Sequence, residues 1–199
     1  EQEVRIFNLS IGSYNDFNDG SDPVEQAVDW AREKGMLVVV AAGNEAQTFG
    51  HVQFTLGPGE SSPVFNYVIP NFFPETYQDP HAFQVIWRDG EAGDGNLSLS
   101  ASGLEPGEGF AEQYLAVSTR NTESKRFVLE VSVAPGGQRV IPLRLSNTAT
   151  AGAPVEVHVF RMAGLGGLTG SSSTSTVMSP ALADRALCVG AWTSKESYT

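Results

Sequence analysis

The alternation of apolar and polar positions divides the chain into regions of different character. Residues 1–50 hold two short apolar runs, Val4–Ile11 and Met36–Ala42. The second run lacks polar alternation, which is typical of a strand that is covered on both faces of a parallel sheet. Residues 51–163 instead carry many short segments with a period of two between Gly, Pro, Asn or Asp residues. This pattern predicts an antiparallel β-sandwich, with a jelly roll as one form of it.

Several apolar positions of that alternation are expected to face the sandwich core. They are the apolar residues of 82–87 together with Leu97, Leu99, Ala101, Phe127, Leu129, Val131, Val133, Val155, Val157 and Val159.

Between the two apolar runs of residues 1–50, the sequence predicts a helix from Pro23 to Lys34. Asp22 can cap it, Pro23 suits its first position, and Glu25 completes a capping box. Gly35 is placed to end it. Apolar residues spaced three and four apart predict the face that packs on a sheet, namely Val24, Ala27, Val28 and Ala31.

The C-terminal part of the chain again holds a short apolar run like those of residues 1–50. Residues 164–178 are rich in Gly, Ser and Thr and read as a linker, and residues 186–191 resemble another buried strand. We therefore predict a parallel α/β fragment that is interrupted by an all-β sandwich. Its predicted parts are residues 1–50 and 179–199 for the α/β fragment, 51–163 for the sandwich, and 164–178 for the linker.

Charge and composition exclude some function classes. The formal net charge is −11 over 199 residues, which argues against a nucleic-acid partner because phosphates require clustered Lys and Arg. No apolar run approaches the roughly 20 residues of a membrane-spanning helix. The single cysteine, Cys188, allows no internal disulfide and suits a buried structural position.

Asn44 is the first candidate for chemistry. It follows a glycine just past the end of the run Met36–Ala42, where open α/β sheets place their ligands. An asparagine amide can donate a hydrogen bond to an oxyanion without titrating. The alternative is an ordinary Gly-Asn turn at the end of a strand.

Three blocks in fixed order give this residue a wider context. Residues Asn8–Gly12, Val38–Glu45 and Ser179–Ala191 resemble the corresponding segments of subtilases, the subtilisin-like serine peptidases. The resemblance implies that Asn44 is the oxyanion-hole side chain. It also implies that Leu9, Ser10, Ile11 and Gly12 pair with the substrate backbone, and that Ala42 and Gly43 wall the pocket for the residue before the scissile bond. Peptides or proteins would be the substrates, and an extracellular or cell-surface parent protein is expected.

The triad of that family is expected to lie outside this chain, because its order is Asp, His, Ser along the sequence. His51, His81 and His158 have no matching motif, and we expect His51 and His81 in loops and His158 in a strand. The chain alone should therefore be inactive. The alternative function is a non-catalytic binding module for protein or glycan, or a pseudopeptidase.

Three further segments are weaker candidates. Ser173–Ala181 superficially resembles a serine nucleophile motif, and Gly164–Gly170 misses the dinucleotide pattern because Thr169 replaces its third glycine. Asp16–Gly20 and Asp89–Asp94 could offer oxygens to calcium, but neither has EF-hand spacing, so solvated turns are favoured. No cofactor is predicted. Exposed sheet in the α/β fragment predicts a homodimer or a strand-exchanged assembly.

Overall fold

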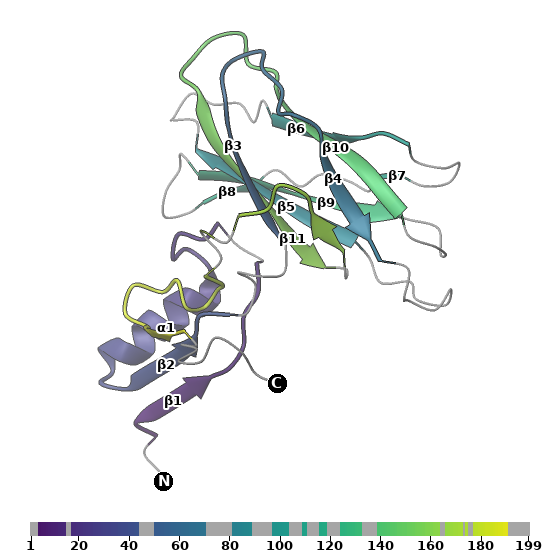
Figure 1. Ribbon diagram of the computed structural model, residues 1–199. Coiled ribbons are helices and arrows are strands. Elements are labelled where there is room, and N and C mark those ends of the chain that lie inside the picture. Colours follow the sequence, from purple (N-terminus) through teal and green to yellow (C-terminus); the bar gives the residue numbers. More distant parts are fainter. Residues whose placement is uncertain are drawn as a thin grey trace. The chain divides into compact units, whose positions relative to one another are not determined.

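The chain forms two compact units, one of which is assembled from both ends of the sequence (Figure 1). The split unit comprises Glu1–Asn44 and Val177–Thr199, and the sandwich unit comprises Glu45–Thr176. The computed structural model describes residues 4–14, 17–43, 50–70, 81–88, 97–103, 109–110, 116–118, 124–132, 139–163, 166–172, 174 and 177–190.

Three short strands form the parallel sheet of the split unit. The central strand β2 (Leu37–Ala41) has β1 (Ile6–Leu9) on one side and β13 (Leu187–Val189) on the other. Leu9 lies opposite Val40, and Val189 lies opposite Ala41. The three segments that the sequence predicted to be neighbours therefore do pair in parallel, although β13 is far from the others in the sequence.

The helix α1 (Pro23–Glu33) begins and ends close to its predicted limits. The carboxylate of Asp22 accepts a hydrogen bond from the Val24 N–H at 2.7 Å, and the Glu25 carboxylate accepts one from the Asp22 N–H at 3.4 Å. These bonds satisfy N–H groups that have no partner inside the helix. Gly35 follows the C-cap with φ of +83°, a conformation that favours glycine.

The buried face of α1 corrects part of the predicted stripe. Val28 is buried and Ala31 packs against the same apolar cluster, as predicted. Val24, in contrast, is 49% exposed, and Ala27 is also exposed. Glu25 takes a buried position instead, since its side chain turns back toward the helix N-terminus as part of the cap.

Residues from both ends of the sequence share the apolar core of the split unit. Its buried members are Val28, Val38, Val40, Ala181 and Ala183. Hydrogen bonds also fix the segment before β13 to the helix. The Asp29 carboxylate accepts from the Arg185 N–H at 2.7 Å, and Arg32 Nε donates to the Arg185 carbonyl at 3.1 Å.

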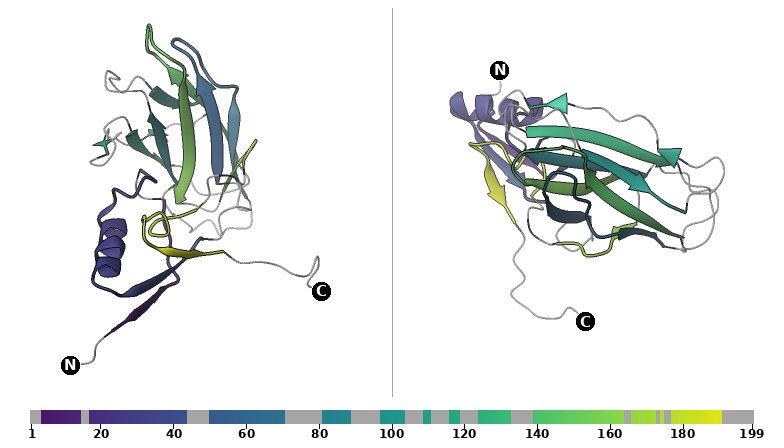
Figure 2. Two further views of the ribbon diagram at one scale, coloured as in Figure 1. Left: turned by 90° about the vertical axis from the view of Figure 1, so that its left-hand side faces the viewer. Right: turned by 90° about the horizontal axis from the view of Figure 1, so that it is seen from above.

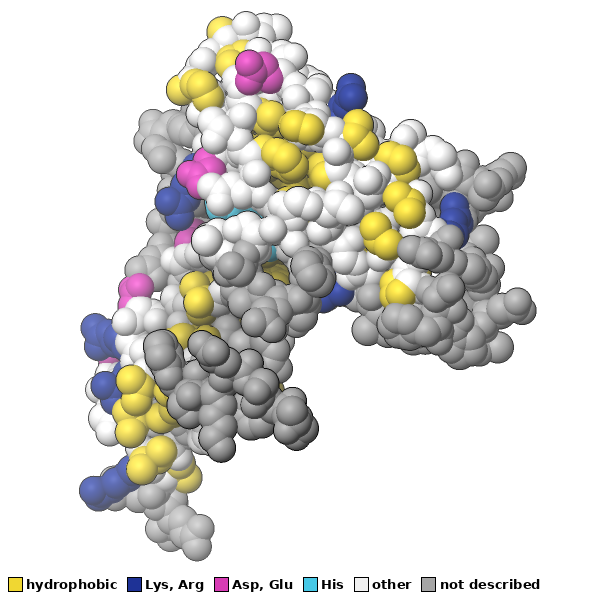
Figure 3. Space-filling view, viewed as in Figure 1, with side chains coloured by type: hydrophobic (Ala, Val, Ile, Leu, Met, Phe, Trp, Pro, Cys, Tyr) yellow, Lys and Arg dark blue, Asp and Glu magenta, His cyan; other side chains and the backbone are white. Residues whose placement is uncertain are grey.

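Part of the split unit's apolar surface stays exposed. Ile6 is 64% exposed, Leu187 is 51% exposed and Val189 is 50% exposed. Hydrophobic side chains are visible at the surface of this unit in Figure 3. Cys188 is exposed as well, which corrects the expectation of a buried thiol. Its strand lies at the edge of the three-stranded sheet, so that the described residues cover it incompletely.

Two antiparallel sheets build the sandwich unit (Figure 2). The larger has the order β3–β11–β5–β9–β7, with β8 also paired to β9, and the smaller has the order β12–β4–β10–β6. Consecutive strands alternate between the sheets from β3 to β6 and again from β9 to β12. The strands of the larger sheet are β3 (His51–Leu56), β5 (His81–Arg88), β7 (Gly109–Phe110), β8 (Ala116–Val117), β9 (Ser124–Ser132) and β11 (Val155–Ala163). Those of the smaller sheet are β4 (Phe65–Ile69), β6 (Leu97–Ala101), β10 (Arg139–Asn147) and β12 (Gly167–Leu168).

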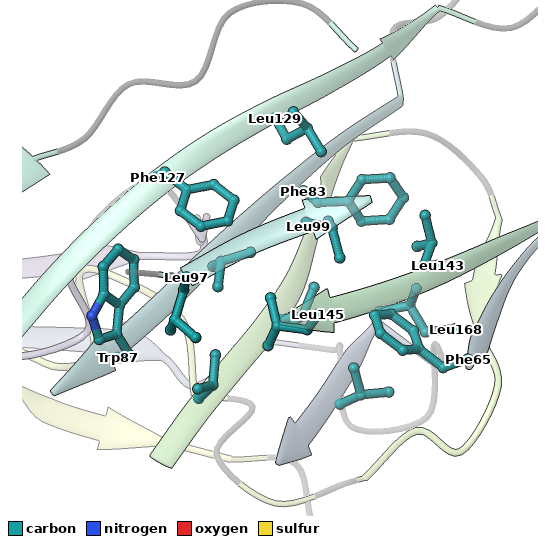
Figure 4. Close-up of a cluster of buried hydrophobic side chains, with 14 of the residues drawn as sticks. Phe65, Phe83, Trp87, Leu97, Leu99, Phe127, Leu129, Leu143, Leu145 and Leu168 are labelled. Atoms are coloured by element: carbon teal, nitrogen blue, oxygen red, sulfur yellow. The ribbon is translucent and has the colours of Figure 1, made fainter. Parts of the chain in front are cut away.

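One apolar cluster fills the space between the two sheets (Figure 4). Leu97, Leu99, Phe127 and Leu129 belong to it, as the period of two predicted. Alternate residues of β11 do so too, namely Val155, Val157 and Val159. Fully burying one such side chain contributes roughly 1.5–3 kcal/mol, so this cluster is the main source of the unit's stability.

The predicted linker is wrong over part of its length. Gly167 and Leu168 form β12, which pairs with β4, and Leu168 is 1% exposed inside the core cluster. Glycine and serine content suggested flexibility, but the pairing with β4 and the burial of Leu168 make residues 167–168 part of the sandwich. The compact unit correspondingly extends to Thr176 instead of ending at residue 163.

Two histidines also differ from expectation. His51 and His81 are the first residues of β3 and β5, not loop residues, and they are 1% and 8% exposed. Overall, the described residues are mostly antiparallel β-structure, with one helix and one three-stranded parallel sheet among them.

Candidate functional site

The candidate site of the split unit lies where β1 and β2 end. These strands are parallel, so their carboxyl ends meet at one edge of the sheet. The segment 10–13 leaves β1 there, and Ala42–Gly43 leaves β2. Crevices at this edge are the usual ligand sites of open α/β sheets.

A third segment joins this edge from the other end of the sequence. Ser13 and Ser179 form an antiparallel bridge, with their N–H groups donating to each other's carbonyls at 3.0 and 3.1 Å. The Met178 N–H donates to the Ala42 carbonyl at 3.1 Å. Residues 178–179 are therefore held by hydrogen bonds to both segments that leave the parallel strands.

Two glycines face the side chain of Met178 at this point. A Cβ atom added to Gly12 would lie 3.0 Å from Met178 Cβ, and one added to Gly43 would lie 2.6 Å from Met178 Sδ. Gly43 also has φ of +98°, where a side chain would be strained. Any larger residue at either position would have to displace the methionine.

The predicted substrate-binding residues are distributed around this edge. Leu9 is half-buried and packs against the apolar cluster beneath α1. Ser10, Ile11 and Gly12 are exposed residues. The pocket residues also flank the edge, with Ala42 half-buried and Gly43 exposed. Asn44 lies outside the described residues, and its oxyanion role stays a prediction.

All three histidines belong to the sandwich unit, and the buried His51 pairs with the half-buried His158. His51 Nε2 lies 3.0 Å from His158 Nδ1, and the rings are stacked with centroids 5.2 Å apart. Phe160 stacks on His51 at 4.5 Å. The carboxylate of Glu156 lies 3.4 Å from His158 Nε2, which favours the tautomer with the proton on that nitrogen.

The surroundings of this pair disfavour its protonation. The pKa of His51 is lowered to about 4, chiefly by burial and next by the neighbouring His158, while backbone groups of Thr174 and Ser172 act in the opposite direction. Burial also lowers the pKa of His158, against the opposing effect of Glu156 and with a smaller contribution from Arg88. A sequence scan could not find this pair, because only the pairing of β3 with β11 brings the two residues together.

Two of the weaker candidate segments lie partly within the described residues, and their contacts there are structural. Gly166 lies against Tyr67, whose hydroxyl accepts from the Gly166 N–H at 3.1 Å, so the described residues 166–170 of the glycine-rich stretch belong to the sandwich unit. Asp19 accepts from the Ser21 N–H at 3.0 Å within its own turn. Ser173, Ser175, Asp16 and residues 89–96 lie outside the described residues.

Within the described part of the chain, no helix has the length and apolar character of a membrane span. No group of three or more His, Cys, Asp or Glu side chains there is arranged to hold a metal ion.

Comparison with known proteins supplies the family context of this edge. The model of the subtilase family matches residues 1–68, a segment that contains β1, α1 and β2. This segment is therefore similar to subtilases. Both β1 and β2, whose ends form the candidate edge, lie within it. The match also supports a relation to serine peptidases.

A solved structure shows a similar fold over most of the chain. The structure of the CspB protease of Clostridium perfringens superposes with a TM-score of 0.68 and 13% sequence identity, covering 94% of this chain. At that identity the likeness concerns the fold. The matched part of this chain covers only 41% of the length of that protein.

Proposed function

We propose that this chain is part of a subtilisin-like serine endopeptidase and supplies its substrate-binding edge and oxyanion hole. The observation that carries the proposal is the parallel pair β1–β2, which lies inside the subtilase match and from whose carboxyl ends residues 10–13 and 42–43 depart. The catalytic triad is proposed to lie in parts of the parent polypeptide outside these residues.

Each part of the edge has a separate proposed role. The exposed segment Ser10–Gly12, which follows the edge strand β1, pairs with an extended substrate. Ala42 and Gly43 wall the pocket for the residue before the scissile bond. The Asn44 amide donates to the oxygen of the tetrahedral intermediate, where a preorganised donor stabilises the developing charge.

The Asn44 role is tested in the full-length parent protein with Asn44→Ala. The donor acts on the transition state, so kcat should fall about 10²–10³-fold, as reported for the oxyanion asparagine of subtilisin, with little change in KM. Asn66→Ala in β4 is the control and should leave kcat nearly unchanged. A loss confined to KM would contradict the oxyanion role.

A binding module is the second candidate, favoured by the sandwich unit's own core between two sheets. Here the sandwich recruits substrate protein or glycan, and the parent is a peptidase or a pseudopeptidase. Replacing residues 45–176 by a short Gly-Ser bridge should then spare hydrolysis of small chromogenic peptides and impair that of proteins. An equal loss of both activities would indicate a folding role instead.

The parent is further proposed to act outside the cell or at its surface, because this is a common setting for subtilases. Fractionation of the producing cells, with immunodetection of the parent in medium and lysate, tests this. Retention of the mature protein in the cytosol would contradict it.

A further inference from the structure

The smaller sheet of the sandwich has an outer face that is partly aliphatic and exposed. In β10, Leu143 belongs to the core cluster, and successive strand residues point to opposite faces. Val140, Pro142 and Arg144 therefore lie on the outer face. Val140 is 53% exposed, Arg144 is exposed and Pro142 is half-buried.

The neighbouring strands extend this face. Val68 of β4 lies opposite Val140, which places two valine side chains next to each other on the sheet. On the other side of β10, Ser100 of β6 lies opposite Arg144. The outer face thus joins a small aliphatic surface to one guanidinium, and hydrophobic side chains are visible at the surface of the sandwich unit in Figure 3.

The charge of this sheet is opposite to that of the chain. The whole chain has 23 Asp and Glu against 12 Lys and Arg, but the four described strands of the smaller sheet contain two arginines and no acidic residue. The Ser100 hydroxyl donates to the Arg144 carbonyl at 3.2 Å. The Arg144 guanidinium has no hydrogen-bond or ion-pair partner in the described structure.

The larger sheet differs at its centre. Gln84 of β5 and Phe160 of β11 also alternate with core residues, yet they are 0% and 2% exposed. These outward positions are therefore closed to a partner. The corresponding positions of β10 are open.

The composition of the outer face favours a protein partner with acidic groups. Anionic membranes and nucleic acids require clusters of Lys or Arg, whereas this face offers a single guanidinium beside aliphatic side chains. Arginine is enriched at protein interfaces and lysine is depleted there. An unpaired guanidinium can bind a carboxylate through two parallel hydrogen bonds. The formal net charge of −11 makes the rest of the chain repel an acidic partner, which directs that partner to the smaller sheet.

We propose that the outer face of the smaller sheet, centred on Val140, Pro142 and Arg144, binds acidic protein substrates of the parent peptidase. The aliphatic side chains contact apolar residues of the substrate, and Arg144 pairs with one of its carboxylates. This inference rests on the proposed role of the sandwich as a binding module and adds the surface and the class of substrate to it. A small contact of this kind suits transient recruitment, because the substrate must leave after cleavage.

The first test measures binding without catalysis. Fluorescently labelled β-casein, an acidic and unfolded protein, is titrated with the 199-residue chain, and fluorescence anisotropy gives the Kd. Arg144→Glu and Val140→Asp should each raise this Kd about fivefold or more, because each places a carboxylate on the proposed contact surface. Both side chains are exposed, and circular dichroism checks that the variants stay folded.

Thr55→Asp and Lys34→Glu are the matched controls, since they make the same charge changes at exposed positions of β3 and after α1. Both should bind β-casein with the wild-type Kd. Absence of wild-type binding, or an equal rise of the Kd in variants and controls, would overturn the proposal. Vesicles of phosphatidylcholine and phosphatidylserine form a second arm. Vesicle binding that Arg144→Glu abolishes, without β-casein binding, would identify a membrane surface and overturn the proposal as well.

The second test uses the full-length parent and compares β-casein with a tetrapeptide p-nitroanilide. Arg144→Glu should lower kcat/KM for β-casein about fivefold through a higher KM and leave the small substrate unaffected. An equal loss for both substrates would contradict recruitment by this face. If the parent, with an intact triad, cleaves neither substrate while the binding results hold, the peptidase function fails and the binding surface stands.

Discussion

Ser13 and Ser179 pair through two backbone hydrogen bonds of 3.0 and 3.1 Å, although the whole sandwich unit lies between them in the sequence. The bridge joins the segment after β1 to the segment before β13. It shows that residues 177–190 complete the split unit instead of extending the sandwich. The following predictions depend on this division of the chain.

The isolated chain should not react with a serine-directed fluorophosphonate. Residues 1–68, which match the subtilase model, carry no triad motif, and the three histidines all belong to the sandwich unit. Mass spectrometry after incubation should find no stoichiometric label, with an active subtilisin as the positive control. A label on one serine, Ser175 included, would contradict the assignment of the triad to other parts of the parent.

Residues 45–176 should fold without the rest of the chain, and a shorter polypeptide ending at residue 163 should be less stable. The shorter version lacks Leu168, which is 1% exposed in the shared core, and it lacks the pairing of β12 with β4. Urea unfolding followed by tryptophan fluorescence compares the two. Equal midpoints would show that β12 contributes nothing to the sandwich.

Leu143→Ala should lower the free energy of unfolding of the sandwich by about 2–5 kcal/mol, because it leaves a cavity at a fully buried core position. Val140→Ala is the control on the same strand. Val140 is 53% exposed, so its truncation should change the free energy of unfolding by no more than about 0.5 kcal/mol. Similar losses for both variants would argue against the observed orientation of β10, in which Leu143 faces the core and Val140 faces solvent.

Acid should destabilise the sandwich through His51. The pKa of His51 is lowered from 6.5 to about 4 in the folded chain, so the unfolded chain binds this proton more tightly. The contribution of neutral His51 to the free energy of unfolding is therefore complete above pH 6.5. It falls as the pH decreases toward 4 and changes little below that value. The total loss is at most about 3 kcal/mol.

Urea unfolding at pH 7 and pH 4.5 measures this effect in wild-type protein and in His51→Gln. The variant cannot take up the proton, so it should lose less stability between the two pH values than the wild type. The comparison cancels the acid effects that both proteins share. An equal loss in both would show that the His51–His158 pair does not govern the pH response.

The isolated chain should assemble through the split unit. Ile6, Leu187 and Val189 are each at least half exposed, and β1 and β13 are both edge strands of the three-stranded sheet. Such surfaces recruit partners. Light scattering after size-exclusion chromatography should find a dimer, and Leu187→Lys with Val189→Lys should shift it toward monomer. A monodisperse wild-type monomer would contradict the assembly.

The sequence by itself determined the local elements and their faces. The cap of α1 follows from Asp22, Pro23 and Glu25, because capping needs only near neighbours. The inward positions of β6, β9 and β11 follow from a period of two, since successive strand residues point to opposite faces. The apolar runs of residues 4–11, 36–42 and 186–191 likewise marked the three strands that pair in parallel.

Only the tertiary structure decided which distant residues meet. The pairing of β3 with β11 brings the buried His51 against the half-buried His158, and the edge of β4 orders Gly167–Leu168, where composition suggested a linker. The folding back of residues 178–179 places Met178 between Gly12 and Gly43. These contacts depend on non-local packing, which overrides local composition and leaves no periodic trace in the sequence.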